Sequence, residues 1–148
     1  MTSGWFAIGI INGKYDVNIG TLLRSARIFG AKLVFTIGKR YTRQCTDTIN
    51  ATNHIPLFHY NTFDEFNKAI PVNCTLVAIE LLEESKPLET FFHPKNAIYL
   101  LGSENDGIPQ DILDKIYHKI KLPGKYSLNV ATAGSIVMYD RILKTKMG

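Results

Sequence analysis

The sequence predicts one α/β domain, built on a mostly parallel six-stranded sheet that helices cover on both faces. Apolar runs of strand length alternate along the chain with segments in which apolar residues recur at helical spacing. The runs are apolar at nearly every position, as expected for parallel strands that are buried on both sides. The chain has 148 residues, of which 45% are hydrophobic and 20% are charged, as is typical of a single globular domain.

The first strand and the first helix are the clearest elements. Residues 5–11 are apolar except for Gly9, and the turn residues Asn12 and Gly13 follow them. Asn18 is a plausible N-cap of the next helix, which Gly30 ends. The apolar stripe of this helix consists of Ile19, Leu22, Leu23, Ala26 and Phe29.

The middle of the chain predicts three more strands and a second helix. Residues 32–37 form the second strand, and a long polar loop with room for a short helix covers residues 38–56. Residues 56–60 are a weak third strand. A helix over residues 62–70 has Thr62 as its N-cap, and Pro71 terminates it. Residues 74–82 form a strongly apolar fourth strand.

The C-terminal third completes the alternation. Residues 97–101 form the fifth strand, and Pro109 opens a helix that runs to about residue 117. Residues 119–122 form a short sixth strand. The last and longest helix covers residues 127–144, with Ser127 at the position of an N-cap.

Polar residues gather directly after three of the predicted strands. They lie at residues 18–24, at residues 102–107, and at Ser127 and Asn129. In open α/β sheets, ligands bind beyond the carboxyl ends of the strands. The three segments therefore share one rim of the sheet if their strands are neighbours, which the sequence leaves open.

The first two polar segments allow both functional and structural interpretations. The guanidinium of Arg24 can hold a phosphate or carboxylate, with Arg27 as a partial neighbour, but from this segment alone an exposed arginine on an amphipathic helix is the preferred interpretation. Gly102 lets the backbone approach a ligand, and Glu104 supplies an acceptor. No Lys-Ser/Thr pair follows Gly107 and no GxGxxG follows the first strand, which excludes a P-loop and removes the main support for dinucleotide binding.

The third polar segment is harder to explain by folding alone. Ser127 as an N-cap is compatible with a catalytic role as well. The amide of Asn129 adds no helix propensity, and the small residues that follow it allow close packing around a ligand or a neighbouring helix. These small or apolar residues are Val130, Ala131, Ala133 and Gly134.

The net charge of +4 and the pI near 9.1 favour an anionic partner. Two groups of basic residues, one in the loop after the second strand and one near the C-terminus, form either solvated faces or a phosphate-contacting surface. They are Lys39, Arg40 and Arg43, and Arg141, Lys144 and Lys146. No apolar run is long enough to span a bilayer, and no secretory leader is visible, which leaves the cytoplasm or an organelle interior. Of these we predict the cytoplasm. The four histidines lack ligand spacing, so no metal is predicted.

Taken in order, the three segments resemble the three motifs of the SpoU/TrmH family of RNA 2′-O-ribose methyltransferases, within the SPOUT superfamily. The motifs cover residues 18–26, 101–109 and 127–131. Their order and approximate separations match across nearly the whole chain. The family usually has Ile-Pro-Met and a longer spacer before Ser-Leu-Asn, whereas here Leu122-Pro123 is followed directly by Gly124-Lys125-Tyr126, which leaves the exact cofactor contacts open.

The resemblance implies a C-terminal trefoil knot, bound S-adenosylmethionine, no metal, and a homodimer whose sites form across the subunit boundary. It makes Arg24 the catalytic arginine. The residues it implies as catalytic partners are Asn18, Glu104, Ser127 and Asn129. The residues it implies as lining the cofactor pocket are Ile79, Glu80, Leu101, Gly102, Ile120, Leu122 and Leu128. The residues we expect to bind RNA are Arg24, Arg27, Lys39, Arg40 and Arg43.

The resulting prediction is S-adenosylmethionine-dependent methylation of a ribose 2′-hydroxyl in RNA by a single domain over residues 1–148, without a separate RNA-binding extension. A small domain recognises the local shape or an exposed loop of an RNA more readily than an extended RNA surface, so tRNA is favoured over rRNA. A non-catalytic RNA-binding or S-adenosylmethionine-sensing module of the same fold is an alternative. A flavodoxin-like protein for a small ligand is another.

Overall fold

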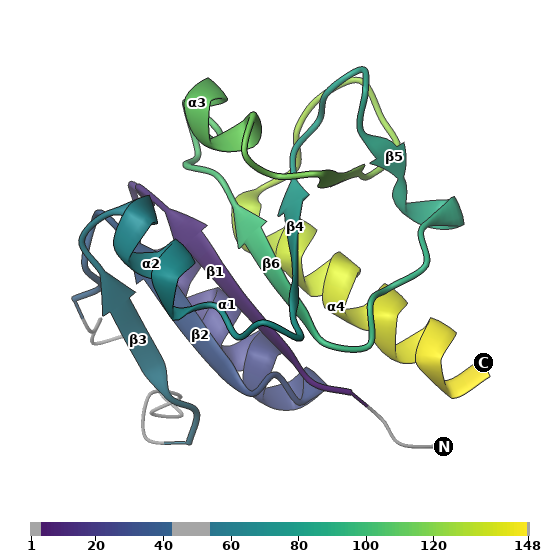
Figure 1. The fold of residues 1–148 in the computed structure, drawn as a ribbon, viewed down its shortest axis with the longest axis horizontal. Helices are drawn as coiled ribbons and strands as arrows, with labels where there is room; N and C mark the ends of the chain where they lie inside the picture. Colours follow the sequence, from purple (N-terminus) through teal and green to yellow (C-terminus); the bar gives the residue numbers. More distant parts are fainter. Residues whose placement is uncertain (1–3, 43–53, 148) are drawn as a thin grey trace.

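The computed structural model describes residues 4–42 and 54–147. The strands are β1 (Phe6–Ile11), β2 (Leu33–Ile37), β3 (Leu57–Tyr60), β4 (Thr75–Ile79), β5 (Lys86–Pro87), β6 (Ala97–Leu101) and β7 (His118–Lys121). The helices are α1 (Asp16–Phe29), α2 (Phe63–Ala69), α3 (Gln110–Leu113) and α4 (Val130–Met147), with a 3-10 turn, η2 (Leu88–Thr90). The strands form one sheet in the order β3-β2-β1-β6-β4-β7-β5, and all of its pairs are parallel (Figure 1).

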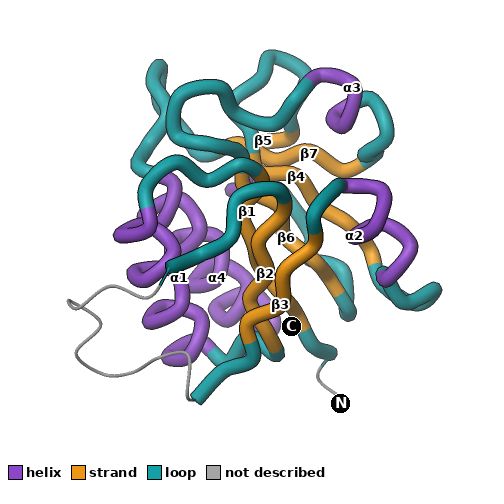
Figure 2. The backbone as a smooth tube through the Cα atoms, turned by 90° about the vertical axis from the view of Figure 1, so that its left-hand side faces the viewer, coloured by secondary structure: helices purple, strands orange, loops and turns teal. Residues whose placement is uncertain are grey.

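The sheet lies between two layers of helices, α1 with α4 on one face and α2 with α3 on the other (Figure 2). Because successive side chains of a strand point to opposite faces, each strand contributes to two separate cores. The core under α1 and α4 includes Ile8, Ile10, Leu22, Tyr99, Leu101 and Met138. The core under α2 and α3 includes Ala7, Ile11, Phe35, Phe66, Leu100 and Ile112. The predicted parallel sheet with helices on both faces is confirmed.

The centre of the sheet explains the uninterrupted apolar runs in the sequence. Every residue of β1 and of its neighbour β6 is buried. On the face above them, α4 approaches closely at Gly134, where an added Cβ would lie 2.8 Å from Cδ1 of Leu22 and 3.0 Å from Cδ1 of Leu101. The small residue at this position therefore serves packing against α1 and the sheet.

The predicted number of six strands was wrong, because the described residues alone form a sheet of seven. The additional strand, β5, has only two residues, Lys86 and Pro87, which pair with β7 at the edge of the sheet. Proline is tolerated at such an edge because one side of the strand needs no ladder donor. The fourth strand also ends earlier than predicted. Its pairing stops at Ile79, and the chain turns through a hydrogen bond from Leu82 N to Glu80 O.

Two helix boundaries differ from the prediction near the N-caps. The first helix begins at Asp16 with Tyr15 as its N-cap and without a side-chain cap, so Asn18 is not an N-cap but a buried residue of the first turn. The helix expected from Pro109 to residue 117 is a single turn, with Pro109 at the N-cap. The predicted cap at Thr62 is confirmed, since its hydroxyl accepts a hydrogen bond from Glu65 N.

The last helix begins three residues later than predicted. It starts at Val130, and Asn129 rather than Ser127 is its cap. The Oδ1 atom of Asn129 accepts a hydrogen bond from Thr132 N at 3.1 Å, and the carbonyl of Asn129 accepts one from Ala133 N at 2.8 Å. The prediction of an N-cap at Ser127 was therefore wrong by two residues.

The basic residues near the C-terminus hold α4 against the sheet. Arg141 is only 4% exposed, and its guanidinium donates hydrogen bonds to the carbonyls of Pro94 at 2.7 Å and Lys95 at 2.6 Å. Lys144 donates to the carbonyls of Leu88 and Phe91. The guanidinium of Arg141 is therefore buried and bonded to carbonyls inside the protein. Arg141 belongs neither to a solvated face nor to a phosphate-contacting surface, the two interpretations left open for this group.

A buried histidine continues this anchor. The His93 side chain is 1% exposed and lies 2.7 Å from both the Tyr99 hydroxyl and Oδ2 of Asp140. Because a carboxylate only accepts, Nε2 of His93 donates to Asp140 and Nδ1 accepts the hydroxyl proton of Tyr99. Burial lowers the pKa of His93, although the hydrogen bond to Asp140 opposes this effect. Burial also raises the pKa of Tyr99 to about 12.

Replacing His93 with glutamine tests its role as a buried, neutral link. Below a pH of about 6.5 the unfolded chain takes up a proton that the folded chain resists, because the folded-state pKa is lowered. The free energy of unfolding therefore falls as the pH drops below about 6.5, and His93→Gln removes this part of the fall. At neutral pH the variant loses about 1–3 kcal/mol. Urea unfolding at several pH values measures both effects, and an equal pH dependence in the two proteins would contradict the assignment.

Candidate active site

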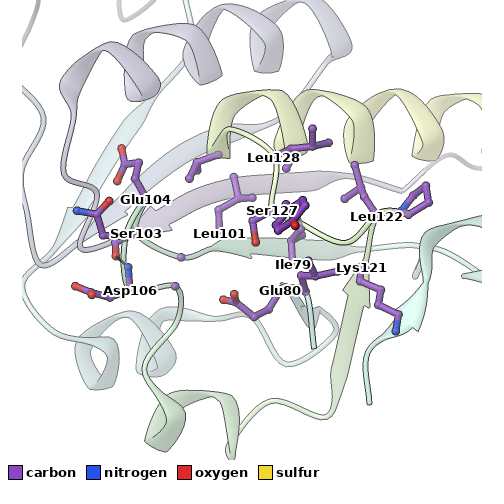
Figure 3. A pocket seen from close by; sticks show the side chains of 18 residues that line it. Ile79, Glu80, Leu101, Ser103, Glu104, Asp106, Lys121, Leu122, Ser127 and Leu128 are labelled. Carbon is purple, nitrogen blue, oxygen red and sulfur yellow. Dashed lines mark hydrogen bonds between the residues drawn. The ribbon is translucent and has the colours of Figure 1, made fainter. Parts of the chain in front are cut away.

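A cavity of about 240 Å³ opens beyond the carboxyl ends of β4, β6 and β7 (Figure 3). Three segments that are distant in the sequence form it: residues 79–81, residues 101–107, and residues 121–133, which include the first turn of α4. One part of the wall is apolar and another carries carboxylates and hydroxyls. The lining residues are Ile79, Glu80, Leu81, Leu101, Gly102, Ser103, Glu104, Asn105, Asp106, Gly107, Lys121, Leu122, Pro123, Tyr126, Ser127, Leu128, Val130 and Ala133.

The cavity gathers most of the residues expected to hold the cofactor. Those that line it are Ile79, Glu80, Leu101, Gly102, Leu122 and Leu128. Ile120 is fully buried in the core and is not among the lining residues. The sequence analysis missed the contribution of Leu81, Lys121 and Tyr126. Their sequence neighbours Glu80, Leu122 and Ser127, which were expected at the site, are the signal that could have indicated them.

A chain of hydrogen bonds joins the three motifs beside this cavity. Nδ2 of Asn18 donates to Oε2 of Glu104 at 2.6 Å, and Nδ2 of Asn129 donates to Oδ1 of Asn18 at 3.0 Å. Asn18 is itself 7% exposed, and both of its bonds are partly buried. The strand neighbours explain this convergence in part. The first motif follows β1, which pairs with β6, whereas β4 separates β6 from β7.

The carboxylate of Glu104 is also the cap that the sequence of α1 does not provide. It accepts hydrogen bonds from the backbone N atoms of Lys14 at 2.7 Å and Tyr15 at 3.1 Å, just before the helix begins. Burial raises the pKa of Glu104, but the bonds from Lys14, Asn18 and Tyr15 outweigh it and leave the pKa below its usual value. Glu104 therefore stays ionised and holds neighbouring groups in place, and it is a poor proton acceptor.

The remaining motif residues lie at or near the rim. Ser127 lines the cavity with an exposed side chain. Arg24 and Arg27 are exposed on α1, and Arg24 is not among the lining residues. Six residues separate Arg24 from Asn18, which corresponds to about 9 Å along the helix axis. Arg24 therefore lies farther along α1 than Asn18, the residue of this helix that belongs to the hydrogen-bonded chain.

The basic loop after β2 lies next to the first turn of α1. Lys39 donates a hydrogen bond to the carbonyl of Lys14 and lies 4.0 Å from Oδ1 of Asp16. Arg40 is exposed. Arg43, the third basic residue expected to bind RNA, lies outside the described residues.

Neither a metal site nor a membrane span is found in residues 4–42 and 54–147. No group of three or more acidic, histidine or cysteine side chains in this part of the chain could hold a metal ion. None of the helices described is both long and apolar enough to cross a bilayer.

Known proteins resemble this chain in sequence and in fold. The mouse tRNA (guanosine(18)-2′-O)-methyltransferase TARBP1 is 24% identical over 144 residues, which cover 88% of this chain but 9% of the mouse protein. This chain therefore spans less than a tenth of that relative.

Two solved structures share the fold. One, from a study of "the 2-OH methylation of C/U34 on tRNA", has a TM-score of 0.85 at 19% identity and covers 98% of this chain and 99% of its own. The other is the SpoU methyltransferase AviRb of Streptomyces viridochromogenes in complex with AdoMet. It has a TM-score of 0.82 at 18% identity and covers 100% of this chain and 60% of its own.

The family model described as the SpoU rRNA Methylase family matches residues 6–139. This match extends from the first strand into the last helix and includes all the segments that line the cavity. The chain therefore belongs to the SpoU rRNA methylase family of RNA methyltransferases.

Proposed function

We propose that this chain transfers a methyl group from S-adenosylmethionine to a ribose 2′-hydroxyl of RNA, with tRNA as the favoured substrate. The observation that carries the proposal is the hydrogen-bonded chain from Asn129 through Asn18 to Glu104, beside a cavity at the carboxyl ends of the strands. It joins all three motifs at one place. The names of TARBP1 and of the structure with a TM-score of 0.85 both refer to tRNA, whereas the family description refers to rRNA.

The cavity suits S-adenosylmethionine in its chemistry. The apolar side chains of Ile79, Leu101 and Leu122 offer a surface for a flat adenine ring, while Ser103 and Asp106 offer hydrogen-bonding partners for a polar tail. Acidic lining residues outnumber the basic one, Lys121, which favours a ligand that carries a positively charged sulfonium. When bound, this cofactor supplies an electrophilic methyl group.

In the proposed reaction, the ribose oxygen forms a bond to the methyl carbon as the bond from that carbon to sulfur breaks. The sulfonium becomes a neutral thioether, and the hydroxyl proton passes to a phosphate oxygen or to water. Arg24 is not assigned as the base, because a guanidinium only donates hydrogen bonds and has no acceptor atom for a proton. We assign it to binding the nucleotide phosphate and polarising the hydroxyl. Asn18, Glu104, Ser127 and Asn129 then orient the nucleotide.

A homodimer completes this proposal. Ile136, Tyr139 and Leu143 are large apolar residues of α4 at spacings that place them on one side of the helix, and they are 39%, 55% and 44% exposed. Ile28 of the neighbouring helix α1 is 69% exposed. A partner that covers this surface would bury the stripe and bring its own Arg24 toward the cavity of this protomer. The predicted trefoil knot stays part of the proposal, supported by the likeness to SpoU folds.

Radiolabelled methyl transfer from S-adenosylmethionine into separated tRNA and rRNA fractions tests the function. We expect label in tRNA, at a nucleotide whose 3′ phosphodiester then resists alkaline hydrolysis, because methylation removes the 2′-hydroxyl that attacks it. Label only in rRNA would contradict the proposed substrate. Binding of the methyl donor without transfer to either fraction would support the non-catalytic module instead.

Arg24→Lys tests the role of the guanidinium. Lysine keeps the charge but loses the planar pair of donors that fits a phosphate, so we expect turnover to fall roughly ten- to a hundredfold. Affinity for S-adenosylmethionine serves as the control and stays unchanged. Turnover near that of the native chain would show that charge alone suffices.

Mixed dimers test whether the site is shared between subunits. Arg24→Ala and Asn129→Ser each inactivate their own homodimer, and serine at position 129 retains an N-cap while losing the amide donor to Asn18. If each site combines Arg24 of one subunit with Asn129 of the other, a heterodimer carries one intact site. We expect activity to reappear after the two variants are unfolded and refolded together. Its absence, with heterodimers present by mass spectrometry, would count against a shared site.

A further inference from the structure

The Glu80 side chain is a carboxylate placed rigidly in the cavity wall, although none of the three motifs contains it. Glu80 is the first residue after β4 and is half-buried. Its backbone N donates to the carbonyl of Ile120 at 3.0 Å, which ties it to β7. Its carbonyl accepts a hydrogen bond at 2.8 Å from Oγ of Ser85, itself 4% exposed. The backbone of Glu80 is therefore fixed on both sides.

The carboxylate is fixed on one side only. Oε2 accepts a hydrogen bond from Ile108 N at 2.9 Å. The carboxylate packs against Gly107. A Cβ added at Gly107 would lie 2.8 Å from Oε1 of Glu80, so a larger residue at this position would displace the carboxylate. Among the described residues, no donor is hydrogen-bonded to Oε1. Burial raises the pKa of Glu80, and the bond from Ile108 only partly opposes this effect.

The neighbours of Glu80 indicate which part of a ligand would supply a donor to Oε1. Ile79 and Leu81 flank it in the sequence and line the cavity with it, and Leu101 lies on the adjacent strand β6 (Figure 3). This is the apolar part of the wall, which suits a nucleoside rather than a charged tail. The two hydroxyls of a ribose are neutral donors that one carboxylate accepts together, and acidic residues take this role in α/β nucleotide sites.

We propose that Glu80 binds the ribose hydroxyls of the methyl donor and thereby selects ribonucleoside ligands for this cavity. The proposal rests on the proposed function and adds a specificity-determining residue to it. Glu80 acts on the donor through its free carboxylate oxygen, while the bonded oxygen keeps residues 107–108 in place.

Calorimetric titration of the full chain with four ligands tests this assignment. The ligands are S-adenosylmethionine, S-adenosylhomocysteine, 5′-methylthioadenosine and the 2′,3′-dideoxy form of 5′-methylthioadenosine. Glu80→Gln keeps an acceptor for Ile108 N but loses the charge, so we expect the first three ligands to bind roughly tenfold more weakly. The dideoxy ligand is expected to bind the native chain and the variant equally. Glu84→Gln, an exposed neighbour outside the cavity, is the matched control and leaves all four affinities unchanged.

Each other outcome overturns the assignment in a distinct way. Weakening of S-adenosylmethionine alone would place Glu80 against the sulfonium. Weakening of only the two ligands with an amino-acid tail would place it against the ammonium group. Equal weakening of all four would show that Glu80 only supports the loop, which a lowered Tm of the variant would also indicate. If the native chain failed to bind S-adenosylmethionine at all, the proposed function would fail first.

Discussion

The arrangement of the site depends on one carboxylate at the start of one helix. Glu104 accepts hydrogen bonds from the backbone N atoms of Lys14 and Tyr15, just before α1 begins, and from the side-chain amide of Asn18 in its first turn. A negative charge at a helix N-terminus is favourable because the helix dipole points its positive end there. The loop after β6 and the start of α1 are thereby fixed to each other. Through Asn18, the start of α4 is fixed to both.

The charges of the molecule are divided between two regions. The cavity carries Glu80, Glu104 and Asp106 against Lys121, although the chain as a whole has a net charge of +4. The exposed basic residues on α1 and after β2 do not line it. Under the proposed function, this division matches two substrates of opposite sign, a cationic methyl donor in the cavity and an anionic RNA outside it.

Secondary structure could be predicted from the sequence where one physical rule dominated. Uninterrupted apolar runs predicted β1 and β6, because only strands covered on both faces need them. The rules failed where tertiary contacts replaced local ones. Asn18 was predicted as a cap because the true cap, Glu104, lies 86 residues away in the sequence.

Other features had no signal in the local sequence. Arg141 was expected at the surface because its acceptors, the carbonyls of Pro94 and Lys95, converge only in the folded chain. The two residues of β5 are too few to show any periodicity. Glu104, Ser127 and most of the residues expected to hold the cofactor line one cavity, but the motifs gave no signal for Leu81, Lys121 and Tyr126, which line it too.

Asn129 has two structural roles, so its conservation in related proteins would not by itself indicate that they are catalysts. This side chain caps α4 and also holds Asn18, so a descendant that had abandoned chemistry would still need it to fold. The same holds for Glu104. Conservation of Asn129 and Glu104 among related proteins would therefore reflect the requirements of the fold. Arg24 and Ser127 have exposed side chains, so their conservation would be the better indication of selection for catalysis.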